Sequence, residues 1–153
     1  MERGLTDVKE FIIRRYRAKD EDNVLRIWYL TSLEAYPFIL PQFWLEHIQI
    51  VKNEYLSQAE IYVIGKDNEI AGFISLMGNY VGALFIDSKY QKKGLGTVLL
   101  DYAEKLKNNL YVDVYKQNNI AMNFYKKYGF YEQREKLQIE TGCMVTTMVL
   151  NRK

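Results

Sequence analysis

Residues Gln91–Thr97 read Gln-Lys-Lys-Gly-Leu-Gly-Thr, between an apolar stretch at Val81–Ile86 and a long helical pattern that opens at Gly94. Backbone N–H groups are unpaired at the start of a helix, and the helix dipole makes that end positive. The two glycines have no Cβ atom, so a ligand can approach the backbone closely, and the two lysines add positive charge. The segment therefore predicts a binding site for an anion such as phosphate.

Other phosphate-binding loops do not fit this segment. A Walker A loop requires Gly-x-x-x-x-Gly-Lys-Ser/Thr, which does not occur in the sequence. A dinucleotide fingerprint requires a third glycine where Leu99 stands. Taken alone, Gly-x-Gly is equally typical of a helix start whose glycines only form a tight turn.

The sequence before this loop alternates short strand and helix patterns. The predicted elements are a strand at Phe11–Tyr16, a helix from Asp20 through Thr31, a loop between Pro37 and Pro41, a helix at Phe43–Tyr55, a hairpin of Ile61–Ile64 and Ile70–Met77 turning at Asp67-Asn68, and a third strand at Val81–Ile86. The last of these is almost continuously apolar, which is typical of a strand in the middle of a sheet.

Two helices and three strands are predicted after the loop. Apolar residues at helical spacing form one stripe made of Leu95, Val98, Leu99, Tyr102, Ala103 and Leu106. A strand at Leu110–Val114, a helix from Asn118 to Lys127 with a glycine stop at Gly129, and strands at Tyr131–Ile139 and Met144–Leu150 joined at Thr141-Gly142 follow. The order β-α-α-β-β-β-α-β-α-β-β predicts one α/β (α+β) domain with a mixed sheet, spanning residues 1–153 with a core at about 11–150.

Composition excludes several classes of protein. The 153 residues are 48% hydrophobic and 26% charged with a net charge of +2, so we expect a folded domain that does not bind nucleic acid. A single cysteine, Cys143, fits a reducing compartment. No apolar run is long enough to span a membrane, and Met1–Glu10 lacks the apolar segment of a signal peptide. We therefore expect a cytoplasmic protein with no membrane contact.

Two linked motifs resemble those of the GNAT superfamily of N-acetyltransferases. Gln91-x-x-Gly94-x-Gly96 resembles the pyrophosphate loop of that family, written Gln/Arg-x-x-Gly-x-Gly/Ala. A second signature, Asn-x-x-Ala-x-x-x-Tyr followed by Gly-Phe, occurs at 118–125 and 129–130. The resemblance covers roughly Ile13 to Leu150, and the order of elements agrees with the family fold.

The resemblance implies a mixed, mostly antiparallel sheet whose two central parallel strands, Val81–Ile86 and Leu110–Val114, splay apart around acetyl-CoA. It implies that backbone groups of the first strand pair with the pantetheine arm and polarise the thioester carbonyl, while the glycine loop holds the pyrophosphate. No metal is expected. The residues assigned to the cofactor are Leu84, Phe85, Ile86, Gln91, Lys92, Lys93, Gly94, Leu95, Gly96, Thr97, Asn118, Ala121, Tyr125 and Lys127.

Tyr125 is the predicted catalytic residue, because a phenol near the sulfur can protonate the departing thiolate by general acid catalysis. The alternatives are that Tyr125 is an ordinary half-buried tyrosine and that Asn118 is only a helix cap. Many relatives carry a glutamate as base on the strand before the loop, but Val81–Ile86 has no carboxylate. Conceivable substitutes are Glu34, Glu46, His47, Tyr80 and Asp113, although a neutral amine could react without a strong base.

The resemblance places the acceptor between Leu30 and His47, where aromatic residues gather. The predicted substrate-binding residues are Tyr36, Phe38, Trp44 and Tyr80. We expect a primary amine on a small molecule or a peptide, attacking the thioester directly, and a homodimer could form through the last two strands. Two alternatives from other classes are a non-catalytic domain that senses CoA and a nucleotide-binding module.

Overall fold

The computed structural model describes residues 10–152, which form one seven-stranded sheet flanked by helices. The strands are β1 (Ile12–Arg15), β2 (Glu60–Lys66), β3 (Glu69–Met77), β4 (Tyr80–Ile86), β5 (Leu110–Tyr115), β6 (Tyr131–Gln138) and β7 (Cys143–Leu150). Their order in the sheet is β1-β2-β3-β4-β5-β7-β6. Only β4 and β5 pair in parallel, which confirms the predicted mixed sheet. The predicted lack of a signal segment at Met1–Glu10 concerns residues that, except for Glu10, lie outside the described part.

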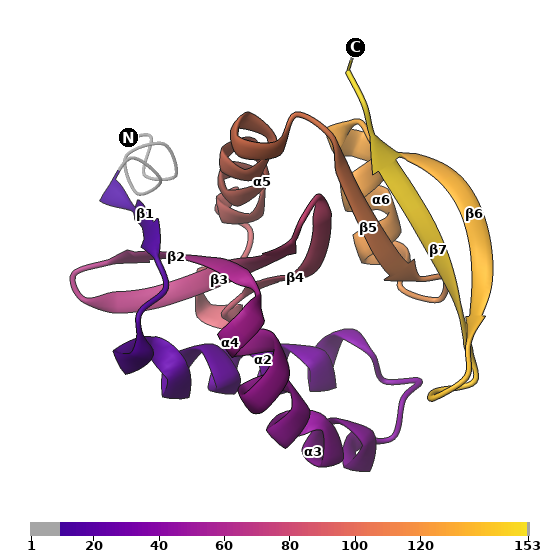
Figure 1. Ribbon diagram of the computed structural model, residues 1–153, viewed down its shortest axis with the longest axis horizontal. Helices are drawn as coiled ribbons and strands as arrows, with labels where there is room; N and C mark the ends of the chain where they lie inside the picture. Colours follow the sequence, from indigo (N-terminus) through magenta and orange to yellow (C-terminus); the bar gives the residue numbers. More distant parts are fainter. Residues whose placement is uncertain (1–9, 153) are drawn as a thin grey trace.

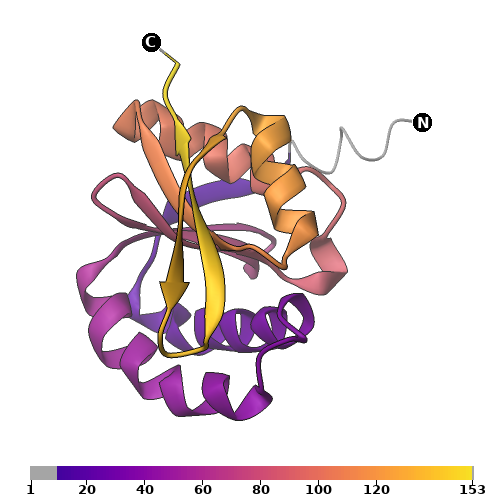
Figure 2. The same ribbon diagram turned by 90° about the vertical axis from the view of Figure 1, so that its right-hand side faces the viewer.

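Helices cover both faces of the sheet (Figures 1 and 2). On one side lie α2 (Glu21–Ala35), α3 (Pro41–Ile50), the π-helical turn η2 (Val51–Tyr55) and α4 (Leu56–Gln58); on the other lie α5 (Leu95–Lys107) and α6 (Asn119–Tyr128). Two short 3-10 helices, η1 (Ala18–Asp20) and η3 (Ser88–Tyr90), precede α2 and follow β4. The predicted order of strands and long helices is confirmed.

The two layers of core follow from the alternation of side chains along the strands. In β2, Tyr62 and Ile64 belong to the cluster beneath α5 and α6, whereas Ile61 and Val63 belong to the cluster beneath α2 and α3. All four are at most 6% exposed. A strand that is apolar on both faces is therefore what a sheet covered by helices on both sides requires.

Two helical details differ from the prediction. The helix expected to end at Tyr55 continues through the π-helical turn to Gln58, because no proline or glycine interrupts it. In α5, Leu106 is 45% exposed in the last turn, while Leu100 outside the predicted stripe is fully buried. Helix α6 lies beside α5, where the Tyr128 hydroxyl contacts the carboxylate of Asp101, so α5 buries a wider face than one stripe predicts.

Candidate active site

A cleft opens where the two parallel strands diverge. Pairing between β4 and β5 is limited to Tyr80 with Tyr111 and Val81 with Val112. Directly after these pairs, Gly82 is an extra residue in β4 with no partner in β3. Val81 faces Leu76 and Ala83 faces Ser75, so Gly82 forms a β-bulge. Such a bulge bends a strand and increases its twist. The bulge therefore ends the pairing with β5 and leaves one edge of β4 open.

The backbone direction along β4 decides which groups face the opening. The amide of Asp87 donates to the carbonyl of Ala71 in β3, at an N–O distance of 2.7 Å. Because backbone groups alternate sides along a strand, Phe85 also directs its N–H and C=O toward β3, whereas Leu84 and Ile86 direct theirs toward the gap. The carbonyl of Ile86 accepts a hydrogen bond of 2.9 Å from the Gln91 side chain, which agrees with this assignment.

The loop before α5 adopts a conformation that its glycines permit. Gly94 is the N-cap of α5 with a φ of +84°, and Lys92 also has a positive φ of +65°. A Cβ atom on Gly96 would lie 3.2 Å from the Phe124 ring of α6, so this glycine allows close packing of the two helices. Gly94 thus provides the turn and Gly96 the close approach. The first residues of α5, whose amides have no partner within the helix, line the cleft.

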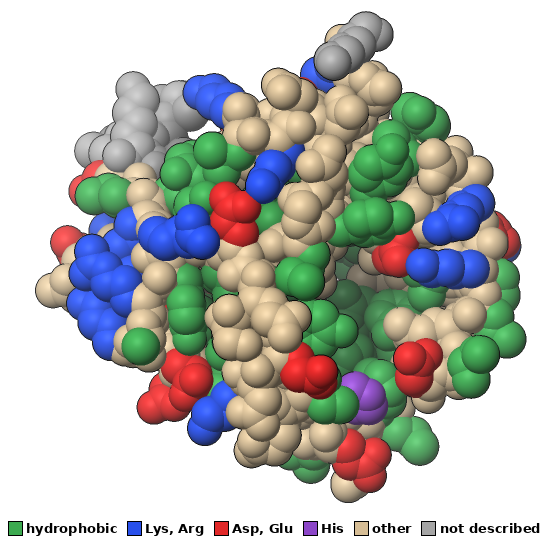
Figure 3. Space-filling view, viewed as in Figure 1, with side chains coloured by type: hydrophobic (Ala, Val, Ile, Leu, Met, Phe, Trp, Pro, Cys, Tyr) green, Lys and Arg blue, Asp and Glu red, His purple; other side chains and the backbone are tan. Residues whose placement is uncertain are grey.

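The cleft has a volume of about 940 Å³ and mostly apolar walls (Figure 3). It brings together the N-terminus of α5, the open edge of β4, the start of α6 and the C-terminal end of α2. Fourteen of the predicted residues line it: Tyr36, Phe38, Leu84, Phe85, Ile86, Gln91, Lys92, Gly94, Leu95, Gly96, Thr97, Asn118, Ala121 and Tyr125. This volume suits a site that encloses a long, partly polar ligand.

Four predicted site residues do not line the cleft. Trp44 is 6% exposed and packs edge-on against Trp28 with a centroid distance of 5.8 Å, so it belongs to the core between α2 and α3. Tyr80 stacks on Tyr111 outside the cleft. Lys93 and Lys127 do not line the cleft, and Lys127 is exposed near the end of α6. Of the predicted basic residues, Lys92 is the one that reaches the wall.

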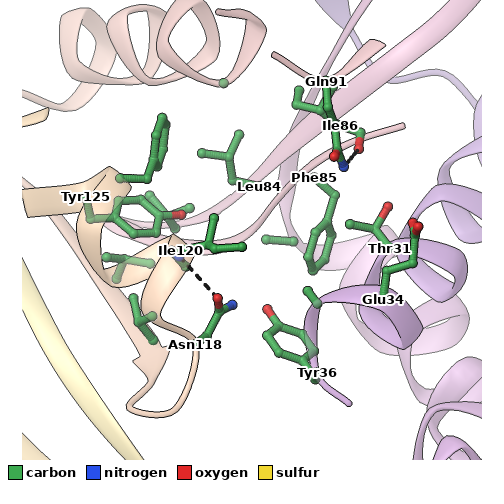
Figure 4. Close-up of a pocket in the computed structure, with 18 of the residues that line it drawn as sticks. Thr31, Glu34, Tyr36, Leu84, Phe85, Ile86, Gln91, Asn118, Ile120 and Tyr125 are labelled. Atoms are coloured by element: carbon green, nitrogen blue, oxygen red, sulfur yellow. Dashed lines mark hydrogen bonds between the residues drawn. The ribbon is translucent and has the colours of Figure 1, made fainter. Parts of the chain in front are cut away.

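Tyr125 lies at the centre of the site. Its ring packs edge-on between Phe124 and Phe130, with both centroid distances 5.2 Å, and is 7% exposed. Its hydroxyl points into the cavity, opposite the hydroxyl of Tyr36 (Figure 4). Burial, and to a lesser extent Tyr36, raises the pKa of the Tyr125 phenol well above its ordinary value. As at the ordinary tyrosine pKa, the phenol is protonated at neutral pH and able to donate.

Asn118 has a structural role that can be seen directly. Its Oδ1 accepts a hydrogen bond of 3.1 Å from the amide of Ala121, which caps α6 (Figure 4). The side-chain NH₂ group makes no hydrogen bond within residues 10–152, and Asn118 lines the cleft. Capping and ligand binding are therefore compatible, because they use different atoms of the amide.

The conceivable bases are dispersed. His47 stacks on Phe43 and its Nδ1 lies 2.7 Å from the Phe43 carbonyl oxygen, as in an ordinary intrahelical contact. Glu46 lies in the same helix, outside the cleft, and its carboxylate accepts a hydrogen bond of 3.3 Å from the side chain of Gln42. Glu34 and Asp113 both line the cleft.

Some residues of the site were missed by sequence reasoning. Thr31, Ile120 and Phe124 line the cleft, and Tyr115 packs against Tyr36 at a centroid distance of 4.9 Å. Ile120 lies within the second signature and is 85% exposed, so an apolar residue in the first turn of that helix was the available signal. Tyr115 carried no such signal, because its contact with Tyr36 joins two distant parts of the chain.

Comparison with known proteins agrees with this geometry. Residues 34–152 match the acetyltransferase (GNAT) domain family. The chain is 31% identical over 121 residues to the peptidyl-lysine N-acetyltransferase YiaC of Escherichia coli, covering 78% of this chain and 83% of YiaC. It superposes on the solution structure of apo YjaB from Escherichia coli with a TM-score of 0.81 and 26% identity, covering 91% of this chain and 96% of YjaB.

A further structure extends the comparison to a bound cofactor. PaiA N-acetyltransferase from Thermoplasma acidophilum, in complex with coenzyme A, has a TM-score of 0.77 at 18% identity, covering 93% of this chain and 99% of PaiA. Since the family match spans most of the chain and the open strand, glycine loop and cleft are all present, the function follows from family and fold together. The chain belongs to the GNAT family and is an N-acetyltransferase that moves the acetyl group of acetyl-CoA to a primary amine.

Proposed function

We propose that the acceptor is the side-chain amine of a lysine in a peptide or protein, and that Tyr125 is the general acid of the reaction. The observation that supports the role of Tyr125 is the direction of its hydroxyl, into the cleft that the open edge of β4 borders (Figure 4). The peptidyl-lysine activity named for YiaC supports the choice of acceptor. The wide, largely apolar cleft can admit the methylene chain of a lysine.

The residues present fit acetyl-CoA. Backbone groups of Leu84 and Ile86 on the unpaired edge of β4 are suited to hydrogen bonds with the amide groups of a pantetheine arm. The free amides of Gly94, Leu95 and Gly96 at the start of α5, with Lys92 beside them, are suited to a pyrophosphate. The cofactor supplies an activated acetyl group and a thiolate leaving group.

Each protein group then has one task. An N–H on the open edge of β4 donates to the thioester carbonyl oxygen and stabilises the negative charge that develops there. Tyr125, which is protonated at neutral pH, gives its proton to the departing sulfur. The amine forms the new C–N bond as the C–S bond breaks and releases its own proton to solvent, and solvent returns a proton to the Tyr125 phenolate. A domain that only sensed CoA would not need such a donor.

The test is a turnover assay with acetyl-CoA across amine classes, followed by mapping of the product by mass spectrometry. We expect acetylation at the Nε of internal lysines in peptides whose N-termini are blocked. Matched peptides with a free N-terminus and no lysine, together with a polyamine, separate the alternative acceptors. Faster turnover of either alternative than of every lysine peptide would refute the proposed acceptor.

Location and assembly are proposals as well. We propose the cytoplasm, because the single Cys143 is a free thiol and a reducing compartment preserves it. Within residues 10–152 there is no helix long and apolar enough to cross a membrane. Homodimer formation through the last two strands stays a prediction, and β6, whose side chains are almost all exposed at the edge of the sheet, is the surface on which to test it.

A further inference from the structure

Charged side chains are distributed unevenly around the cleft. Among the described residues, its walls carry one basic side chain, Lys92, and two carboxylates, Glu34 and Asp113. Asp113 is already compensated: one oxygen accepts a hydrogen bond of 2.7 Å from the Thr147 hydroxyl, and the other pairs with the Lys136 ammonium at 3.0 Å. Glu34 has no hydrogen bond and no ion pair within residues 10–152. It is therefore the uncompensated negative charge of the cleft.

The position of Glu34 in α2 makes the electrostatic potential at this wall more negative. Glu34 is the last residue but one of the helix, where the unpaired carbonyl groups give the helix dipole its negative end. The last turn of α2 contains no basic residue that would offset that end. Figure 4 shows Glu34 and Thr31 side by side, separated from Tyr125 by the open space of the cavity. This wall is thus suited to a cation.

The opposite pole belongs to α5. Its positive N-terminal end, with Lys92, faces the same cleft and is suited to the phosphates of the cofactor. The start of α5 and the end of α2 therefore present charges of opposite sign to one cavity. An acidic acceptor would be repelled from the α2 side, and a cationic acceptor would be drawn there.

An aromatic wall adjoins the acidic pole. Tyr36 and Phe38 line the cleft directly after α2 and contact each other with a centroid distance of 6.0 Å. Tyr115 and Trp44 hold the Tyr36 ring in place, at centroid distances of 4.9 Å and 5.3 Å. Rings fixed in this way can pack against a methylene chain, and their faces attract an ammonium group.

We propose that Glu34 and the C-terminal end of α2 form the subsite that receives the acceptor as a cation, before its ammonium group loses a proton to solvent and reacts. The acceptor class is an alkylammonium, which rests on the proposed function in that a lysine side chain is the leading example. Glu34 acts in binding and orientation of the acceptor. It takes no part in protonating the thiolate, which is assigned to Tyr125.

The test compares Glu34→Gln with Glu54→Gln as a matched control. Both side chains are exposed, and both variants remove one negative charge, but Glu54 lies on η2 away from the cleft. KM and kcat are measured for a lysine peptide at saturating acetyl-CoA. We expect Glu34→Gln to raise the peptide KM about fivefold, the upper end for an exposed charge pair, with kcat and the KM for acetyl-CoA unchanged. The control should equal the parent.

Two further measurements separate charge recognition from a structural effect. The kcat/KM of the parent for the peptide should fall as salt is raised, and Glu34→Gln should flatten that dependence. A peptide whose lysine is replaced by its aminooxy analogue, which is uncharged at neutral pH, should be used equally by parent and variant. An unchanged peptide KM in Glu34→Gln, or an equal penalty on the charged and uncharged acceptors, would overturn the subsite.

Failure of the proposed function gives a different result. If the parent acetylates no lysine peptide but acetylates another alkylamine, the lysine assignment is wrong and the same comparison is made with that amine. A parent that is active on a cationic acceptor while Glu34→Gln matches it overturns the subsite alone. A parent that acetylates only amines that are uncharged at the assay pH overturns both.

Discussion

Replacing Tyr125 by Phe isolates the proposed proton donor. The ring stays between Phe124 and Phe130, and the hydroxyl that is lost makes no hydrogen bond within residues 10–152. The free energy of unfolding should therefore change by less than about 1 kcal/mol, since no internal hydrogen bond is broken. Acetyl-CoA affinity should be preserved because the ring that forms part of the cleft wall is kept. The expected loss is confined to chemistry.

General acid catalysis contributes about a hundredfold to ten-thousandfold, which corresponds to about 3 to 5 kcal/mol of transition-state stabilisation. Because burial raises the pKa of Tyr125 above its ordinary value, which already lies far above neutral pH, the phenol is protonated at pH 7 and the full effect is expected there. Single-turnover acetyl transfer at saturating cofactor measures it, because product release cannot mask a slower chemical step there.

Tyr128→Phe is a matched control from the same helix. The Tyr128 hydroxyl donates to carboxylates of α5, to Asp101 at 2.6 Å and to Glu104 at 3.0 Å, and it does not line the cleft. This variant should lose about 1 kcal/mol of stability and keep the parental turnover, the opposite pattern to Tyr125→Phe. Equal single-turnover rates for the parent and Tyr125→Phe would remove Tyr125 from catalysis and leave it as part of the cleft wall.

Three other predictions follow from the loop, the ligand and the buried phenols. Gly94→Ala should strain the backbone by about 1 to 2 kcal/mol, because φ is +84° there, and Gly96→Val should displace Phe124. Each variant should therefore bind CoA more weakly when measured by isothermal calorimetry, and parental affinity in both folded variants would refute the loop assignment. CoA at a hundredfold excess over its Kd should stabilise the fold by about 2.7 kcal/mol, or roughly 5 to 10 °C in Tm, and an unmoved melt would count against cofactor binding. Burial raises the pKa of Tyr115 to about 12 and raises the pKa of Tyr36 further, so above about pH 10 these phenols stay protonated in the folded state but ionise in the unfolded chain. The free energy of unfolding, measured with urea, should therefore fall from pH 9 to pH 11, and an unchanged value would contradict the burial of these two phenols.

The cofactor half of the site could be predicted from the sequence because its determinants are local. The glycine loop is continuous, its conformation is set by Gly94, and the helix it opens is identified by the apolar spacing of α5. The second signature is likewise contained in one helix and its cap at Asn118. Motifs of this kind can be recognised without knowing which strands are neighbours. Lys127 does not line the cleft, because it lies near the C-terminal end of α6 while the start of that helix borders the cleft, so its assignment to the cofactor stays a prediction.

The acceptor half could not be predicted in the same way because it depends on contacts between distant segments. Trp44 and Tyr36 are both aromatic and close in sequence, but only Tyr36 reaches the cleft, since Trp44 fills the space against Trp28. The carboxylates were equally ambiguous. Asp113 is compensated by Thr147 and by Lys136 of β6, whereas Glu34 is not, and that difference requires β5, β7 and β6 to be adjacent.

The single bulge in β4 explains why both halves meet at one point. Were β4 to pair with β5 along its whole length, the N–H and C=O groups of Leu84 and Ile86 would be used within the sheet and no cleft would separate α2 from α6. The extra residue Gly82 changes which backbone groups face β5 and ends the pairing after Val81. The same distortion therefore exposes the strand edge that is suited to a thioester and opens the space between Tyr125 and Tyr36. Deleting Gly82 to restore regular pairing should abolish acetyl-CoA binding in a chain that still folds, and retention of affinity by that variant would show that the open edge of β4 is not needed.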